Sequence, residues 1–521
     1  MSIEDVTHGE SLTERIQHGS LKEYQKKSKV SEVEQLQTTQ TQLLDQQRKT
    51  VVEGLLADNR LRLVDIPQVI VNNSEYYRTT FLNQQLSPLL TNGNRLTIED
   101  FLQKVDLVTK NLVNCTNTEN LLVNIEALPK QQTFWANNDR ESISLIPVFN
   151  LLPVKRFFAK TGTSVGNGEG NGYITLQLRN FLKGGENLIF DATIGTRTRT
   201  SYLLNLNFPI NNNAFLRSEN LAFMNSRKIE WASHDQILKG ISNKIIKYGI
   251  GNINDPKNFH EQFTQEWSFE NVWRSVAVLD KAASDAVLLN CGDDFKSSFL
   301  YNIKYDDREN KMLAQSGKMW KFQVEYAPSF FRAYQHSNFL KYSFESVFAQ
   351  PLTNRTFCNF SFRGGMLQNL SSFGYCNIMD KFNIGGPTDV RGFNYNGLGP
   401  RAATTSSNKN FGTSMGDRVG GDFYYSTGLS LFTTIPKIAP TSEHNLKFHS
   451  FVNAGKLVNL NGENNGGVKD LLKEPSVSIG CGLLYNHPAA RFELNFTLPV
   501  TAHESDAMRK GIQYGIGLSF L

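Results

Sequence analysis

From Arg156 to the last residue, apolar and polar positions alternate with a period of two. The alternation is clearest in the segments 446–455, 476–485, 491–498 and 511–520. Because successive side chains of a β-strand point to opposite faces, each segment predicts a strand with one apolar and one polar surface. In the last segment, the apolar face consists of Ile512, Tyr514, Ile516, Leu518 and Phe520.

The number and polarity of such segments favour a membrane barrel over a soluble sandwich. Four more regular segments lie near 156–165, 172–182, 186–197 and 200–209. Those between 215 and 350 are less regular and include a long insertion at 278–294. The polar faces suit a wet lumen and the aromatic-rich faces suit lipid, and a sheet in hydrocarbon must close because its edges would leave backbone groups unsatisfied. We predict an antiparallel transmembrane β-barrel of about sixteen strands over 153–521.

The first part of the chain has a different composition. Residues 1–45 are polar and rich in Gln, Lys, Glu and Ser, which predicts a largely disordered or loosely helical segment. Met1–Ser20 carries four acidic residues and no apolar stretch, so it fits neither a secretory signal nor a matrix presequence. A barrel without a secretory signal is expected in the mitochondrial outer membrane.

Between residues 46 and 152 the pattern predicts a small α/β domain. Its expected elements are strands at 61–71, 121–128 and 143–151, and helices at 77–90 and from Thr97 onward. Thr97 and Asp100, three residues apart, form a capping signature for the second helix. The order β-α-α-β-β resembles a single polypeptide-transport-associated (POTRA) domain, and a generic α+β domain also fits it.

Composition and charge exclude several classes of function. The net charge is only +5 over 521 residues, and no compact basic stripe with interleaved aromatic residues indicates a nucleic-acid partner. No apolar run reaches about eighteen residues, the length of a transmembrane helix, although barrel strands escape this test. The five cysteines lack C-x-x-C spacing and are odd in number, which favours unpaired thiols over one incidental disulfide.

The sequence also lacks motifs for catalysis or metal binding. Ser316–Lys318 is too short a match for a phosphate-binding loop, and there is no G-x-S-x-G elbow. The nine histidines lack ligand spacing, and the acidic pair in Gly292–Asp294 predicts a solvated turn rather than a metal site. We therefore expect no enzyme activity, no metal and no cofactor.

One loop carries an unusual charge. Residues Gly385–Phe393 read G-G-P-T-D-V-R-G-F and lie among the predicted strands. Arg391 is flanked by glycine and apolar residues, whereas a solvated loop is usually polar. A charge in such a setting indicates a specific partner, so the loop around 383–402 is predicted to fold back into the barrel. The alternative is an arginine in a solvated outer loop.

Several motifs, taken in order, resemble the outer-membrane barrel-insertase superfamily, whose bacterial member is BamA. Val390, Arg391, Gly392 and Phe393 match the V-R-G-F signature of its loop between the eleventh and twelfth strands. Gly420–Asp422 resembles the G-G-[ND] start of the next strand, and Phe451–Gly455 resembles an F-x-D-x-G strand.

Other features narrow the resemblance to the mitochondrial branch, the central barrel subunits of the sorting and assembly machinery. These features are the single POTRA-like unit, the missing signal, and L-Q-L-R-N-F at 176–181 before G-G-E-N at 184–187. The resemblance covers about 50–521 and implies an integral protein of the mitochondrial outer membrane whose POTRA domain faces the intermembrane space.

The resemblance also bears on the partner of Arg391. Bacterial relatives place acids on the strands beside the loop arginine, but this chain has Ser430 and Asn453 at those positions. Asp422 and Glu493 lie on predicted lumenal faces. The candidate partners of Arg391 are therefore Asp422, Asn453 and Glu493.

The two end strands predict a weak seam. The first strand contains Thr161, Gly162, Thr163, Ser164, Val165 and Gly166, and its two glycines weaken pairing. The last strand fits the mitochondrial sorting pattern, with the polar residue, glycine and hydrophobic positions at Gln513, Gly515, Leu518 and Phe520. The resemblance suggests that client strands with the same pattern replace this strand by β-augmentation on the first.

The function that the resemblance implies is insertion of β-barrel precursors into the mitochondrial outer membrane through lateral opening between the first and last strands. The expected partners are β-barrel precursor proteins, peripheral subunits of the sorting and assembly complex, and membrane lipid. The alternatives are a passive outer-membrane pore and a protein-translocating barrel of the same superfamily.

Overall fold

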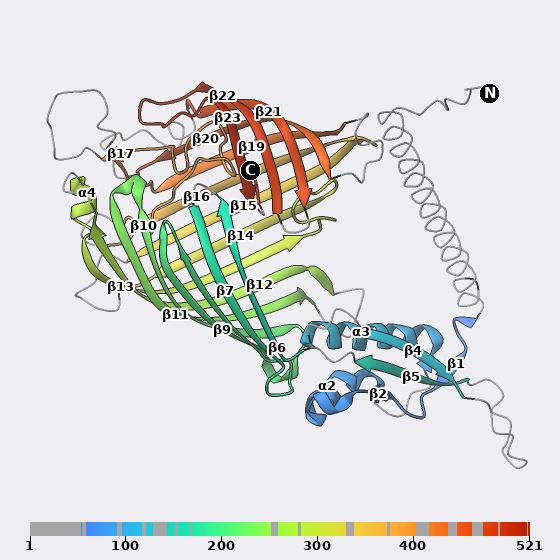
Figure 1. Ribbon diagram of the computed structural model, residues 1–521. Coiled ribbons are helices and arrows are strands. Elements are labelled where there is room, and N and C mark those ends of the chain that lie inside the picture. The colour runs from blue at the N-terminus through green and yellow to red at the C-terminus, as the bar shows by residue number, and fades with distance from the viewer. Residues whose placement is uncertain are drawn as a thin grey trace, which may run out of the picture. The chain divides into compact units, whose positions relative to one another are not determined.

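The computed structural model describes residues 54, 59–90, 96–116, 121–128, 143–151, 155–166, 169–251, 259–279, 283–329, 338–371, 376–402, 416–435, 445–460, 473–487, 490–517 and 519–521. Of these described residues, those within 151–521, 73–85 and 110–121 form one compact unit, and those within 54–72, 86–109 and 122–150 form a second unit. Figure 1 labels their helices and strands. The segment 1–45, predicted to be disordered or loosely helical, lies outside the described residues.

The N-terminal α/β region is built around a sheet of five short strands in the order β2-β5-β1-β3, with β4 paired to β5. Its elements are β1 (Leu63–Asp65), β2 (Ile70–Asn72), η1 (Ser74–Tyr76), α2 (Thr79–Leu90), β3 (Leu96–Thr97), α3 (Ile98–Thr116), β4 (Leu121–Ala127) and β5 (Ile143–Leu151). One stripe of α3 is buried through Phe101, Val105, Val108 and Leu112. This mixed α/β arrangement is consistent with the predicted POTRA-like domain.

The predicted strand at 61–71 is wrong in one respect, because it is two strands. Val64 in β1 pairs with Ile143 and Ile70 in β2 pairs with Val148, so both halves lie parallel to β5. Pro67 lies between them and has no N–H to donate to a ladder.

The predicted start of the second helix has the geometry of a cap. The backbone N–H of Asp100 donates to Thr97 Oγ1 at 3.2 Å, and the Thr97 hydroxyl donates to the Asp100 carboxylate at 2.8 Å. The first bond satisfies a backbone N–H that the first helical turn leaves free, and the second holds the Thr97 hydroxyl in place.

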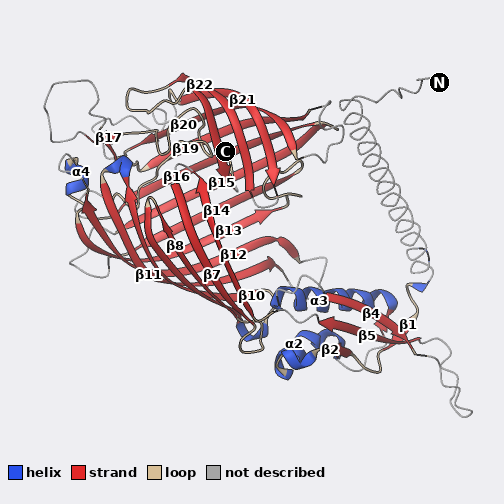
Figure 2. Ribbon diagram, viewed as in Figure 1, coloured by secondary structure: helices blue, strands red, loops and turns tan. Residues whose placement is uncertain are grey.

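Among the described residues, sixteen antiparallel strands form one sheet that runs from β6 to β23 (Figure 2). The first eight are β6 (Phe157–Gly166), β7 (Glu169–Arg179), β8 (Asn187–Gly195), β9 (Thr198–Pro209), β10 (Leu216–Ile229), β11 (His234–Ile250), β12 (His260–Val278) and β13 (Gly292–Asp306). The others are β14 (Gly317–Ala327), β15 (Phe339–Thr353), β16 (Thr356–Asn369), β19 (Phe423–Thr434), β20 (Leu446–Val458), β21 (Ser476–His487), β22 (Ala490–Thr501) and β23 (Gly511–Gly517). The predicted barrel of about sixteen strands is confirmed.

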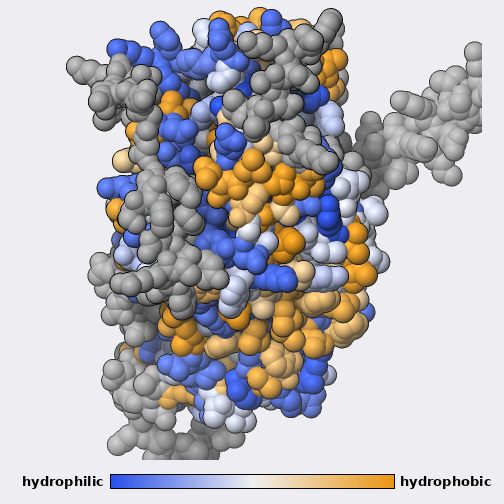
Figure 3. Space-filling model, turned by 90° about the vertical axis from the view of Figure 1, so that its left-hand side faces the viewer, coloured by the Kyte–Doolittle hydropathy of each residue, from blue (hydrophilic) through white to orange (hydrophobic). Residues whose placement is uncertain are grey.

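The alternation of the sequence becomes two faces of the sheet. In β22 the residues Arg491, Glu493, Asn495 and Thr497 are buried, while the apolar residues between them are exposed on the outer wall. Apolar side chains gather in patches on the face that Figure 3 displays. An exposed apolar outer wall is the surface that a barrel presents to lipid.

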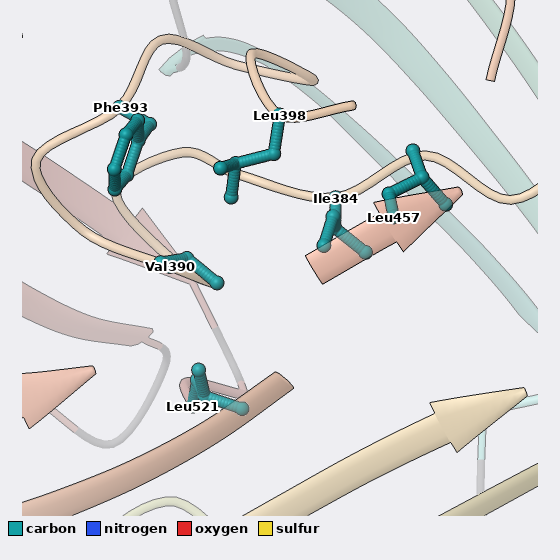
Figure 4. Packing of buried hydrophobic residues seen from close by; sticks show 6 residues of the cluster. All are labelled: Ile384, Val390, Phe393, Leu398, Leu457 and Leu521. Carbon is teal, nitrogen blue, oxygen red and sulfur yellow. The ribbon is translucent and has the colours of Figure 1, made fainter. Parts of the chain in front are cut away.

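The connection between the eleventh and twelfth strands, β16 and β19, contains the V-R-G-F motif. It carries the short strands β17 (Arg401–Ala402) and β18 (Asp417–Arg418), and the isolated bridge Ile384↔Leu398 closes the loop on itself. Its apolar residues pack against the lumenal side of the wall in a cluster of Ile384, Val390, Phe393, Leu398, Leu457 and Leu521 (Figure 4). In the structure this loop is therefore folded inward.

Two predicted features of the barrel differ in the structure. The insertion at 278–294 contains a short helix, α4 (Asp285–Leu288), and the wall resumes at Gly292. Asp294, predicted in a solvated turn, is buried and pairs with Arg274 of β12. Arg274 and the hydrogen bond from Asn377 Nδ2 at 3.1 Å stabilise this buried carboxylate in the lumenal wall.

The last strand is also shorter than predicted. β23 ends at Gly517, and the apolar residue Phe520, predicted on the lipid face, is buried with only 7% of its surface exposed. Leu518 lies outside the described residues.

None of the helices in the described ranges combines the length and the apolar content needed to cross a membrane.

Candidate functional site

Arg391 lies at the centre of the candidate site and has no exposed surface. Its Nε donates to Glu493 Oε2 at 2.9 Å and its Nη2 donates to Glu493 Oε1 at 3.2 Å. This two-bond geometry matches the planar guanidinium to the planar carboxylate, which gives a stronger and more directional contact than a single hydrogen bond. The alternative of a solvated outer-loop arginine is therefore wrong.

The other side of the guanidinium is also occupied. Arg391 Nη1 donates to Asn453 Oδ1 at 3.2 Å and to the backbone carbonyl of Leu521 at 3.0 Å. The rings of Phe451 and Phe520 lie 4.8 Å and 5.5 Å from the guanidinium carbon. Such ring faces stabilise a cation that has lost its water.

The structure thus brings Arg391 together with two of its three candidate partners. Asp422 lies elsewhere, with its carboxylate 3.6 Å from Lys381 Nζ and accepting from the backbone N–H of Leu460 at 3.3 Å. Asp422 directly precedes β19, and its carboxylate pairs with Lys381 near the start of the loop rather than with Arg391.

The carboxylate that pairs with Arg391 lies on β22, whereas the resemblance implies acids on β19 and β20. At the expected acid position of β19, Ser430 Oγ lies 3.1 Å from His449 Nε2 of β20. At the expected acid position of β20 stands Asn453, a neutral acceptor. Glu493 of β22 supplies the negative charge that both positions lack.

A second arginine uses the same carboxylate. Arg491, also of β22, contacts Glu493 through its guanidinium, so the three side chains carry two positive charges and one negative charge. The ring of Phe520 lies 4.5 Å from the Arg491 guanidinium and the ring of Phe432 lies 5.0 Å from it. The aromatic faces therefore compensate part of the excess positive charge.

The backbone beside Arg391 is fixed by the last strand. The Gly392 N–H donates to Gln513 Oε1 at 2.9 Å, and Gln513 Nε2 donates to the carbonyl of Phe393 at 3.0 Å. Gly392 has φ +84°, and a Cβ there would lie 3.0 Å from the Ser478 Cβ, so glycine suits this position. Gln513, predicted only as part of a sorting pattern, therefore also braces the loop.

Sequence reasoning missed a further brace, the connection between β22 and β23. The Arg509 N–H donates to the carbonyl of Gly392 at 2.8 Å, and the Asn394 N–H donates to the carbonyl of Ala507 at 2.9 Å. Backbone bonds of this kind leave no side-chain signal in a sequence.

It also missed a buried charge network at the other end of the loop. Asp380 accepts from Arg274 Nη1 at 2.7 Å, lies 3.6 Å from Lys296 Nζ, and accepts from Lys341 Nζ through its backbone carbonyl at 2.7 Å. Asp294 and Glu325 complete the network by pairing with Arg274 and Lys296. Three cations thus face three carboxylates, and the isolated charges gave no pattern along the chain.

The two end strands of the sheet define the seam. Between the described residues of β6 and β23 no ladder is formed, and β23 has 7 residues against 12 in β22. Gly162, which is predicted to weaken strand pairing, also leaves room for the Tyr173 side chain, because a Cβ there would lie 2.7 Å from Tyr173 Oη. The side chains of Ser164, Val165 and Gly166 lie outside those that the structure describes.

No group of three or more His, Cys, Asp or Glu residues in the described ranges could hold a metal ion. The five cysteines, all within those ranges, are free thiols, and they are Cys115, Cys291, Cys358, Cys376 and Cys481.

Fold and site together define an outer-membrane type of β-barrel, with an α/β domain before it and an inward loop held in the lumen by a buried arginine. Among known families, the one described as the Omp85 superfamily domain matches residues 180–520. The chain belongs to the Omp85 superfamily, and its relatives lie in the barrel-insertase branch of the mitochondrial sorting and assembly machinery, as the sequence predicts.

Curated relatives match most of the chain. It is 29% identical over 486 residues to the sorting assembly machinery 50 kDa subunit of Saccharomyces cerevisiae, covering 88% of this chain and 95% of that protein. It is 30% identical over 483 residues to a SAM50-like protein of Schizosaccharomyces pombe, covering 90% of this chain and 93% of that protein. The human homologue of sorting and assembly machinery component 50 is 30% identical, covering 72% of this chain and 75% of that protein.

The fold is also similar to a solved structure. BamA from Haemophilus ducreyi lacking POTRA domains 1–3 superposes with a TM-score of 0.65 at 13% sequence identity, covering 87% of this chain and 84% of that chain.

Proposed function

We propose that this protein inserts β-barrel precursors into the mitochondrial outer membrane by lateral opening between β6 and β23. The observation that carries the proposal is the seam, where the described residues of the two end strands form no ladder. Each end strand therefore offers a backbone edge. An arriving precursor, the client, is expected to use that edge as a template.

The physical need for such an edge follows from the membrane. A client strand cannot enter hydrocarbon with unpaired N–H and C=O groups, because each costs several kcal/mol. Pairing with β6 satisfies one side of the strand at the moment of entry, and each later strand is templated by the one before. The driving force is burial of the client's apolar wall, so no nucleotide is required.

The proposal places the barrel in the mitochondrial outer membrane and its α/β domain in the intermembrane space, where clients arrive. It assigns β-barrel precursors as clients and peripheral subunits of the sorting and assembly complex as partners. The protein acts as an assembly factor rather than as an enzyme.

A passive pore is disfavoured by the lumen. The inward loop fills part of the lumen with a buried apolar cluster. Arg391 and Gln513 connect the loop to β20, β22 and β23. A channel gains nothing from a loop anchored by a desolvated arginine, whereas an insertase needs a device that keeps an incompletely paired barrel in shape.

The test follows a newly imported barrel client in mitochondria depleted of this protein. Insertion of the barrel should be lost while import of proteins with helical membrane anchors continues. Unchanged barrel insertion would contradict the proposed function. A second arm replaces the five native cysteines and places one cysteine at Thr163 of β6, which should then crosslink to a cysteine in the client's last strand.

A further inference from the structure

The residues that follow β23 leave the wall and enter the lumen. β23 ends at Gly517, and Phe520 and Leu521 are then buried, with 7% and 3% of their surfaces exposed. The strand beside them, β22, continues to Ala490, beyond Arg491, which pairs with Gly517. The segment 519–521 thus leaves the ladder with β22 and makes its contacts inside the barrel.

Both backbone polar groups of Leu521, its N–H and its carbonyl, form hydrogen bonds. The Leu521 N–H donates to the carbonyl of Thr388 at 3.1 Å, and its carbonyl accepts from Arg391 Nη1 at 3.0 Å. Arg363 Nη2 adds a bond to Ser519 Oγ at 2.9 Å. Two of these three bonds recognise main-chain atoms, so they fit any peptide that takes the same path.

The two apolar side chains occupy different surroundings. The Phe520 ring lies between the guanidinium groups of Arg391 and Arg491, at 5.5 Å and 4.5 Å from their central carbons. Leu521 packs in the cluster of loop residues around Val390 (Figure 4). The surroundings of Phe520 form a subsite for an aromatic ring, and the surroundings of Leu521 form a subsite for an aliphatic side chain.

Glycines in the wall leave the room that the segment fills. A Cβ at Gly428 would lie 3.0 Å from the carbonyl carbon of Leu521, and one at Gly515 would lie 3.2 Å from the Phe520 ring. A Cβ at Gly517 would lie 3.2 Å from the Thr388 methyl group. Gly515, predicted as the glycine of the sorting pattern, therefore also makes space for the Phe520 ring.

We propose that this part of the lumen is a binding site for an extended peptide with two apolar residues at its end, occupied here by 519–521 of the same chain. When a client strand replaces β23, the residues that follow that strand take the site. The inference rests on the proposed function and adds to it a lumenal position for the client's last residues.

Continuity with β23 is the reason for assigning the site to the client. The segment follows β23 directly, so a client strand in the place of β23 delivers its own next residues to the same position. Recognition through the main chain and through apolar packing tolerates the sequence differences among clients.

The test uses the full-length protein in mitochondria, with its five native cysteines replaced. Thr388→Cys alone should crosslink to a cysteine at the last residue of an imported barrel client. Thr388→Cys with Leu521→Cys forms a disulfide that keeps the segment in the site. Oxidation should then block client release, and a reductant should restore it.

A matched control locks the wall away from the seam. Gln323→Cys and Ser343→Cys are cross-strand partners in β14 and β15, and their disulfide should leave insertion unchanged. If the client crosslinks to Thr163→Cys but never to Thr388→Cys, and the lock at 388 and 521 is harmless, the lumenal site is overturned while the proposed function stands. If neither crosslink forms, the proposed function itself fails.

A second variant covers the case in which the cysteine pair prevents folding. Phe520→Ala empties the aromatic subsite but leaves the main-chain bonds of Leu521 in place. The weaker occupant should be exchanged more easily, so the client crosslink to Thr388→Cys should form faster than with Phe520 present. An unchanged rate, in a protein that is folded and inserted normally, contradicts the proposal.

Discussion

At the scale of single residues, the site depends on Glu493. This carboxylate has no exposed surface and holds two guanidinium groups, from Arg391 of the loop and Arg491 of its own strand. Without it, two cations would stand in a desolvated lumen with only amides, carbonyls and ring faces around them. A buried charge is stable only when it is paired.

Glu493→Gln should therefore destabilise the barrel by about 3–5 kcal/mol, the usual cost of removing one partner of a buried pair. The measurement is the thermal or denaturant unfolding of the purified barrel in detergent. Glu230→Gln is the matched control, because Glu230 pairs with Lys228 and Arg197 in a solvated setting. That change should cost about 1 kcal/mol or less, and equal costs for both variants would contradict the assigned role of Glu493.

A second prediction at this scale concerns Cys115 in α3. Burial raises the pKa of its thiol to about 12, from an ordinary value of 9.0. The folded state therefore holds a proton that the unfolded state loses above pH 9, so the free energy of unfolding falls as the pH rises beyond that value.

Thiol labelling checks this directly. At pH 8 a maleimide should modify Cys291, which is exposed, and spare Cys115 until the protein is unfolded. Rapid labelling of Cys115 in the folded protein would show that it is not buried as described.

At the scale of elements, the sequence predicts what local pattern controls and misses what distant contacts control. Alternation predicts the strands because each strand has one lipid-facing and one lumenal face, and the Thr97 cap is a local signal. The inward course of 519–521 depends on Arg391, which lies 130 positions from Leu521 along the chain. The alternation of 511–520 continues past Gly517 and therefore gives no warning that the strand ends there.

Burial of polar residues follows the same division. Arg391 is predictable as a partnered residue because its neighbours are glycine and apolar. The network around Asp380 is not, because its members come from four strands and the loop, and each alone is an ordinary charge in a strand or turn.

A prediction at this scale concerns the first part of the loop, residues 376–390, which we call its stem. Asp380→Asn leaves three cations against two carboxylates in the network, so the stem should detach from β12 and β13. Hydrogen–deuterium exchange in 376–390 should rise. Asp307→Asn, in an exposed turn between β13 and β14, is the control and should change nothing. Protection that persists in Asp380→Asn would mean that the stem is held by its apolar contacts alone.

At the scale of the whole barrel, the loop joins opposite walls. Counted from β6, β12 is the seventh strand and β22 is the fifteenth, so the two anchors are eight strand-to-strand steps apart in a sheet of sixteen strands, with seven strands between them. Asp380 binds the first wall and Arg391 binds the second. Ten residues lie between Asp380 and Arg391, and the eleven Cα-to-Cα steps reach at most roughly 35–40 Å when extended, which is long enough to cross a lumen.

A strut between opposite walls explains how a barrel with an incomplete seam keeps its cross-section. The ladders of the other strands fix neighbour distances, but a sheet with two free edges can still flatten or uncurl. A tie across the diameter opposes that motion without closing the seam. Under the proposed function, such a tie allows the two end strands to stay unpaired for a client.

This geometry predicts that the two anchors act together. Asp380→Asn and Glu493→Gln each free one end of the strut, and the other end still holds the loop inside. The double variant removes both charged anchors, so its single-channel conductance in planar bilayers should exceed the sum of the two single increases, because the bonds of Gln513 and of the backbone alone then restrain the loop. Asp307→Asn with Glu230→Gln is the charge-matched control and should conduct as the unaltered protein does. Additive increases in the double variant would mean that the anchors hold separate parts of the loop and that no tie crosses the barrel.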